Sequence, residues 1–178
     1  MEDYVEEMAY GGIRLPDAVR RDPIRVMSLL RALARNVGTE ASVATLVRDS
    51  AALGVGLGEE TAADYLHALM RLMVYEPAPA WSPVLRSRAR VRLKPKHFLA
   101  DPALATALLA AGVDELRRDL KTFGFLFESL AVRDLRVYAA QLGADVYHYR
   151  DSNNLEVDAI MLRISGSGHC GLGLSGHR

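Results

Sequence analysis

The first half of the chain is predicted to form three helices, because its apolar residues recur at three- and four-residue steps. The predicted helices cover residues 23–37, 43–53 and 59–74. Asp22 with Pro23 behind it, and Ser42, are residue types that favour the start of a helix, while Gly38 is typical of a helix end. Three prolines between residues 77 and 83 then prevent any continuation of the third helix.

The stretch from Val84 to Phe98 changes to a period of two, which predicts a strand with cations along one face. Alternate positions carry the basic stripe Arg86, Arg88, Arg90, Arg92, Lys94 and Lys96. Such a stripe attracts phosphate groups, and we expect it to bind nucleic acid. The alternative is a half-exposed edge strand, on which lysine and arginine prevent unwanted strand pairing.

Two further helices are predicted in the second half. Asp101 followed by Pro102 favours a helix that runs to about Ala111 and is closed by Gly112. A longer helix follows and ends at Gly143. Its expected buried side consists of Leu126, Phe127, Leu130, Ala131, Leu135, Val137, Tyr138 and Leu142.

Residues 144–150 and 155–164 are rich in strand-forming residue types and are joined by the turn-forming residues 151–154. They predict a β-hairpin. From Ser165 onward the chain is rich in glycine and serine and has few side chains to pack. We therefore expect residues 165–178 to be a disordered tail.

Three helices followed by a basic two-stranded element is the order of a winged-helix module, whose third helix enters the major groove of DNA. The exposed positions expected on that helix are Glu60, Asp64, His67 and Arg71. Two of these four residues are acidic, which weakens the case for base recognition. The alternative is a winged helix used for protein packing, since a fold by itself does not specify a function.

Composition excludes several classes of function. The 178 residues include 22 basic and 22 acidic side chains, so any attraction to nucleic acid must come from local clustering. The single cysteine, Cys170, excludes an intramolecular disulfide and fits a reducing cytoplasm. The acidic N-terminus does not resemble a signal peptide, no apolar run is long enough to span a bilayer, and we expect no membrane role.

Three carboxylates are candidate metal ligands. Alternation places Glu156 and Asp158 on one side of the last predicted strand, and a helix beside it would bring Glu128 close. Converging carboxylates hold a hard cation such as Mg²⁺, which polarises a phosphodiester and activates water. The alternative is a solvated strand face, because acidic residues are mostly exposed.

Other chemistry has no support in the sequence. The five histidines show no metal-binding spacing: His67, His97, His148, His169 and His177. Cys170 lacks the local features of a nucleophile. The chain contains no GxxxxGK[ST] motif, so we expect no cofactor in this chain other than Mg²⁺ at the carboxylates.

Several short motifs resemble, in the same order, a prokaryotic family of ATP-binding proteins with an N-terminal AAA-type ATPase and a C-terminal DUF4143 domain. They cover about Asp22 to Leu162. The motifs are TAADYLHAL at 61–69, KPKHFLAD at 94–101, FLFE at 125–128, and YRD at 149–151 leading to EVD at 156–158.

The resemblance implies a helix-rich α+β fold, in which a winged-helix-like domain precedes an incomplete PD-(D/E)XK nuclease-like α/β domain. The implied boundaries are an N-terminal segment at 1–21, the winged-helix-like domain at 22–101, the partial nuclease-like domain at 102–164 and the tail at 165–178. It matches Glu128 and Asp158 to the helix glutamate and strand aspartate of the nuclease motif. The Glu-x-Lys of that motif is absent, since no lysine follows Asp158.

Three hypotheses follow. The first is a truncated accessory module of an AAA-type ATPase, which binds DNA or another protein and is catalytically inactive alone, because the lysine and the P-loop are both missing. The second is a stand-alone winged-helix DNA-binding regulator. The third is a weak metal-dependent nuclease.

Overall fold

The computed structural model describes residues 21–82, 94–151, 155–165 and 168–174. Within them the chain is helix-rich with one small antiparallel sheet, which confirms the α+β class. The elements in chain order are α2 (Pro23–Arg35), α3 (Val43–Ala52), α4 (Glu59–Arg71), α6 (Pro102–Leu108), α7 (Val113–Arg118), α8 (Leu120–Gln141), β1 (Ala144–Arg150), β2 (Glu156–Ser165) and β3 (Gly168–Leu174).

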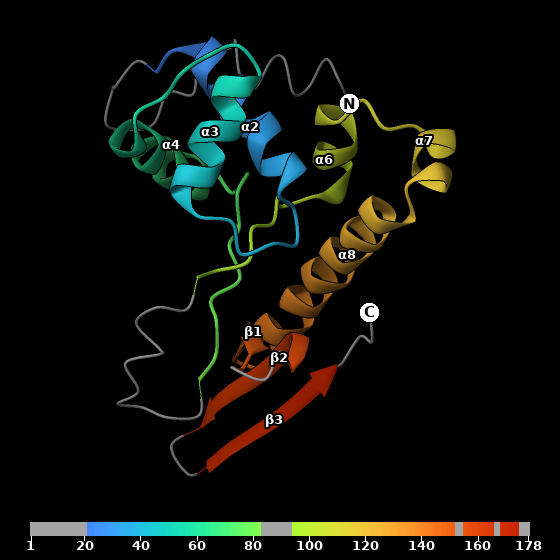
Figure 1. Ribbon diagram of the computed structural model, residues 1–178. Coiled ribbons are helices and arrows are strands. Elements are labelled where there is room, and N and C mark those ends of the chain that lie inside the picture. The colour runs from blue at the N-terminus through green and yellow to red at the C-terminus, as the bar shows by residue number, and fades with distance from the viewer. Residues whose placement is uncertain (1–20, 83–93, 152–154, 166–167, 175–178) are drawn as a thin grey trace.

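A helical unit of α2, α3, α4 and α6 lies at one end of the molecule (Figure 1). The Asp22 side chain caps α2 by accepting a hydrogen bond from the Ile24 backbone, and Ser42 caps α3 in the same way through Thr45. Leu29 and Leu30 of α2 are fully buried, because α3 and α6 both pack against this helix. The local signals of the first half of the sequence therefore predicted these helices correctly.

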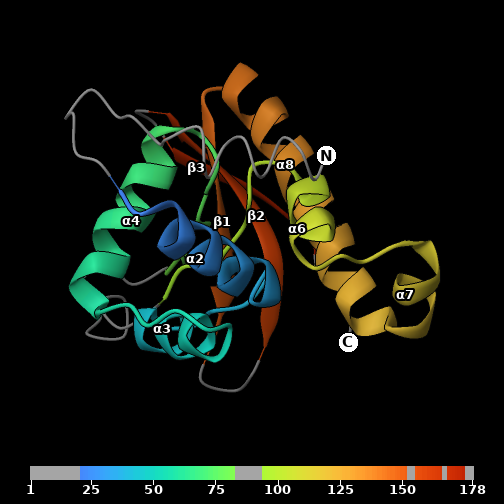
Figure 2. The same cartoon turned by 90° about the horizontal axis from the view of Figure 1, so that it is seen from above.

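The sheet has the strand order β1-β2-β3, with both pairs antiparallel. Ala144 pairs with Arg163 and Tyr147 with Ile160, and the register shifts between Tyr147 and Tyr149. The long helix α8 runs from α7 down to this sheet and packs on β1 and β2 (Figures 1 and 2). The predicted hairpin is confirmed.

Two irregular segments connect the helical unit to the sheet. Ala78 and Lys96 exchange backbone hydrogen bonds of 2.9 and 3.0 Å, so the segments pair with each other. The His148 amide of β1 donates to Pro79, and its carbonyl accepts from the Trp81 amide at 2.7 Å. The segment that follows α4 therefore lies along the outer edge of β1 and fixes the sheet against the helical unit.

The structure corrects three expectations. The glycine-rich segment Gly168–Leu174, expected to be disordered, forms β3, because the edge of β2 offers it backbone hydrogen bonds that need no side-chain packing. Residues 113–118 form the separate short helix α7. Five residues expected on the buried side of the long helix are exposed, because the sheet lies against a different face of α8. These exposed residues are Phe127, Leu130, Val137, Tyr138 and Leu142.

The strand expected over residues 84–98 lies largely outside the described residues, which resume at Lys94. The described end of this stretch forms isolated bridges, with Lys96 pairing to Ala78 and His97 to Val37. Lys94 is exposed, whereas Lys96 is 1% exposed. Lys96 therefore does not share an exposed basic face with Lys94, because the chain turns its side chain into the interior.

Candidate functional site

Lys96 lies at the centre of three carboxylates. Its Nζ is 2.8 Å from Glu128 Oε1, 2.8 Å from Glu156 Oε1 and 2.9 Å from Asp158 Oδ1. The side chains of Lys96 and Glu128 are 2% and 9% exposed, while those of Glu156 and Asp158 are 29% and 23% exposed. The four residues, named the lysine cluster below, thus reach from the interior to the surface.

Three separate elements position the lysine cluster. Glu128 lies on the buried face of α8, next to Ser129, which is also buried. Glu156 and Asp158 are two residues apart on β2, so the alternation of a strand places them on one face. Lys96 is held by its backbone pairing with Ala78. The site therefore exists only when the connecting segment that carries Lys96, α8 and β2 are assembled.

The electrostatics keep Lys96 charged. Burial by itself lowers the pKa of the Lys96 ammonium, but the hydrogen bonds to Glu128, Glu156 and Asp158 and the attraction of the Glu128 charge outweigh it, and the pKa ends above its ordinary value. An ammonium has three donors, which matches the three carboxylates around it. One positive charge then faces three negative charges, so the lysine cluster carries a net negative charge.

A histidine flanks the lysine cluster. His148 is fully buried on β1, and its Nε2 donates to the Lys94 carbonyl at 2.9 Å. Its Nδ1 and Glu40 Oε1 are both buried without a hydrogen-bond partner, 3.9 Å apart. Burial lowers the pKa of His148, against the opposing influence of its hydrogen bond and of Glu40. His148 is therefore a neutral acceptor at this edge of the site.

The structure brings together the three carboxylates singled out in the sequence and adds Lys96, which sequence reasoning assigned to the basic stripe. Pro95 interrupts the alternation beside Lys96, and His97 and Phe98 behind it are buried. Pro95 and the less polar residues after Lys96 are the sequence signal that could have predicted a different environment for Lys96 than for the arginines of the stripe. A lysine was sought after Asp158, as the nuclease motif requires, whereas Lys96 precedes all three carboxylates in the sequence.

Four residues of the basic stripe cannot be compared with this site, and Lys94, which is described, is exposed. Arg86, Arg88, Arg90 and Arg92 lie outside the described residues, and their binding to nucleic acid stays a prediction. On α4, Asp64 is bound by the Arg21 guanidinium at 3.1 Å. That ion pair leaves Asp64 engaged within the protein.

No three His, Cys, Asp or Glu side chains of the described residues are arranged to hold a metal ion. The Lys96 ammonium takes the central position among the carboxylates instead. In the same described part of the chain, no helix is both long and apolar enough to cross a membrane.

The comparison with known families corrects the resemblance drawn from the short motifs. The matching family model is "Domain of unknown function (DUF8612)", over residues 1–117, so the assignment to DUF4143 is wrong. The expectation of an AAA-type ATPase partner rested on that assignment and loses its basis. The motifs misled because they are short and composed of common residues.

The match includes Lys96 and ends before Glu128, Glu156 and Asp158. The chain matches no curated protein and no solved structure. Because the family model spans more than half of the 178 residues, the chain belongs to the DUF8612 family.

Proposed function

We propose that this chain cleaves phosphodiester bonds of nucleic acid with the help of a divalent cation, and that the lysine cluster is its reactive centre. The observation that carries the proposal is the position of Lys96 Nζ, within 2.9 Å of Glu128, Glu156 and Asp158. The sequence-based reasons to expect inactivity were the absence of Glu-x-Lys after Asp158 and the absence of a P-loop. Lys96 offers an ammonium to the same carboxylates from an earlier part of the chain.

The charge of the site supports this proposal over a purely structural role. A buried ion pair contributes little net stability, because desolvation offsets the attraction between the charges. Three carboxylates around one ammonium give the four residues of the lysine cluster an excess of negative charge. This excess would attract a divalent cation.

The donor set fits Mg²⁺. This ion usually takes one or two protein carboxylates and fills its other positions with water and substrate oxygens. Glu156 and Asp158 are oxygen donors on one face of β2, and both are partly exposed. When bound there, Mg²⁺ would polarise the phosphodiester and lower the pKa of a coordinated water.

Lys96 would stabilise the negative charge that develops on the phosphoryl oxygens, which is the usual role of a lysine in phosphoryl chemistry. All three ammonium donors are occupied by carboxylates, so one carboxylate must turn away before Lys96 can reach a phosphate. Glu156 and Asp158 are more exposed than Glu128, and either has room to turn. Glu128 would then keep Lys96 in place.

Nucleic acid is the proposed substrate because phosphodiester bonds join its nucleotides. The predicted stripe at Arg86, Arg88, Arg90 and Arg92 would attract its backbone. A winged-helix arrangement of the helical unit and a nuclease-like arrangement around α8 and β2 are part of this proposal.

The test is cleavage of labelled single- and double-stranded DNA and RNA by the full chain with Mg²⁺, Mn²⁺ or a chelator. We expect cleavage with the metal ions, at least a hundredfold slower in Asp158→Asn, because removal of an electrostatic stabiliser typically costs about this factor or more. The matched pair Lys96→Met and Lys94→Met separates the buried lysine from its exposed neighbour. Only Lys96→Met should lose activity.

A thermal melt of each variant establishes that it is folded, and Asp158→Asn, whose side chain is partly exposed, serves if Lys96→Met does not fold. Absence of metal-dependent cleavage on all four substrates contradicts the proposal. Salt-dependent DNA binding without cleavage would favour a DNA-binding regulator instead.

A further inference from the structure

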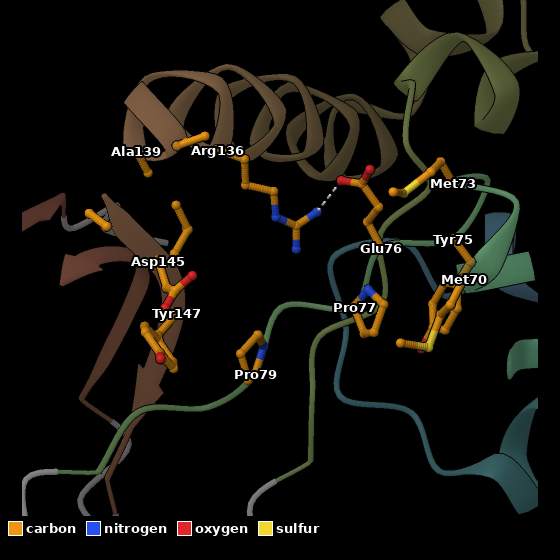
Figure 3. A pocket seen from close by; sticks show the side chains of 13 residues that line it. Met70, Met73, Tyr75, Glu76, Pro77, Pro79, Arg136, Ala139, Asp145 and Tyr147 are labelled. Carbon is orange, nitrogen blue, oxygen red and sulfur yellow. Dashed lines mark hydrogen bonds and ion pairs between the residues drawn. The ribbon is translucent and has the colours of Figure 1, made fainter. Parts of the chain in front are cut away.

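A second site lies beside the segment that connects α4 to the sheet. It is an open pocket of about 650 Å³ between the end of α8, the start of β1 and residues 75–79. This volume lies within the range of small-molecule sites. Figure 3 shows Arg136 entering from α8, Asp145 and Tyr147 lying on β1, and Glu76 and Pro77 across from them on the segment that follows α4.

The charged groups that line the pocket are the guanidinium of Arg136 and the carboxylates of Glu76 and Asp145. Arg136 Nη1 donates to Glu76 Oε2 at 3.0 Å, and its guanidinium lies over the Phe98 ring. These contacts fix Arg136 in one orientation. Among the described residues the guanidinium makes no other hydrogen bond to the protein, so its further N–H donors are available to a ligand.

Asp145 supplies the complementary group. It is exposed and lines the pocket, and its carboxylate makes no hydrogen bond or ion pair to the rest of the described chain. The remaining walls include the Tyr147 ring and the apolar side chains of Met70, Pro77 and Pro79. A flat ligand with both acceptors and donors at its edges could stack on the Tyr147 ring and meet both charged groups.

These requirements select against simpler ligands. A free phosphate would be repelled, because Arg136 is opposed by Glu76 and Asp145 and the pocket has a net negative charge. An amine would satisfy the carboxylates and leave the Arg136 donors unused. Guanine satisfies both: its O6 and N7 accept from an arginine, and its N1–H and N2 amino group lie together and donate to a carboxylate.

We infer that this pocket binds a guanine base, with Arg136 and Asp145 recognising its edges and Tyr147 providing a stacking surface. Unstacked bases of single-stranded nucleic acid bind proteins in this way. The inference rests on the proposed function for nucleic acid as the ligand. Arg136 and Glu128 lie on one helix, about 12 Å apart along its axis at 1.5 Å per residue, so one strand would reach both sites.

The experiment titrates the full chain with guanosine, inosine, adenosine and uridine, followed by calorimetry and by amide NMR shifts. Inosine lacks only the N2 amino group of guanosine, so we expect it to bind roughly tenfold more weakly, the loss typical of one base-specific contact. Asp145→Asn should weaken guanosine binding and remove most of the difference from inosine. Asp114→Asn, an exposed carboxylate on α7, is the matched control and should change nothing.

Tyr147→Leu should weaken all four nucleosides together, since stacking does not depend on base identity. Equal affinities for guanosine and inosine, or no saturable binding of guanosine, would overturn the inference. Nucleosides contain no phosphodiester, so failure here is separate from failure of the proposed cleavage. Asp158→Asn should slow cleavage at least a hundredfold and retain guanosine binding, which tests the two sites independently.

Discussion

Lys96 Nζ lies 2.8 Å from Glu128 Oε1, and both side chains are buried. Replacing Lys96 by Met would remove the ammonium that all three carboxylates contact. Loss of one partner from a buried ion pair costs about 3–5 kcal/mol of unfolding free energy. We expect a loss of this size in urea unfolding of Lys96→Met at pH 7, while Lys94→Met on the exposed side changes stability by less than about 0.5 kcal/mol. Similar stabilities for the two variants would show that the carboxylates find other partners.

Gly38 is predicted to be intolerant of a side chain. Its φ is +70°, and a Cβ there would lie 2.8 Å from Phe125 Cδ1 and 3.5 Å from Glu128 Oε2. Backbone strain and this contact should make Gly38→Ala less stable by about 1–3 kcal/mol. Gly124→Ala is the matched control with the opposite sign. It lies inside α8 with open space around it, and should gain about 0.5–1 kcal/mol.

His97 is predicted to make stability depend on pH. Its Nε2 donates to the Ala41 carbonyl at 2.8 Å, so its Nδ1 is the acceptor that the Tyr75 hydroxyl contacts at 2.6 Å. Burial lowers the pKa of His97, although the Ala41 hydrogen bond opposes this shift. The folded state then binds fewer protons than the unfolded chain below about pH 6.5. The stability contribution is therefore full above this pH and is lost as the pH falls toward the folded pKa.

The measurement is urea unfolding of the wild type, His97→Gln and His67→Gln between pH 7.5 and 5.5. His97→Gln should be less stable at pH 7.5, because it loses two buried hydrogen bonds, and should show a shallower fall in acid. His67→Gln, on the exposed side of α4, should retain the wild-type slope. A His97→Gln slope equal to that of the wild type would assign the acid sensitivity to another group, such as His148.

Deleting residues 166–178 is predicted to weaken the sheet. β3 pairs with β2 from Ala159 to Ser165, so its removal opens the outer edge of β2. A two-stranded sheet is marginal without further packing. Amide hydrogen exchange of the β2 residues that face β3 should become faster, while exchange in α2 should not change. Unchanged protection of β2 would mean that β3 contributes nothing to its stability.

The basic stripe retains its prediction of phosphate binding. Replacing Arg88, Arg90 and Arg92 together by Ala should flatten the salt dependence of DNA binding, since each phosphate contact contributes about 0.9 to the logarithmic slope. Binding measured by fluorescence anisotropy over a series of salt concentrations gives that slope. If the slope does not change, the arginines protect a strand edge instead.

The sequence alone was sufficient for the local structure. Asp22, Ser42 and Asp101 accept hydrogen bonds at three helix starts where the caps were predicted. The strands β1 and β2 also lie where the β-rich runs indicated. These features depend on residues within a few positions of one another, so composition and periodicity contain the necessary information.

Only the tertiary structure decided which faces are buried and which charges meet. Phe127 and Tyr138 are apolar yet exposed, because the buried face of α8 is the one that the sheet contacts. Lys96 is 32 residues from Glu128 and 62 residues from Asp158, and neither spacing has a periodic signal. The alternation that grouped Lys96 with the basic stripe holds only along a continuous strand. A buried charge requires a partner, and the assembly of the Lys96 segment, α8 and β2 determines which partner it finds.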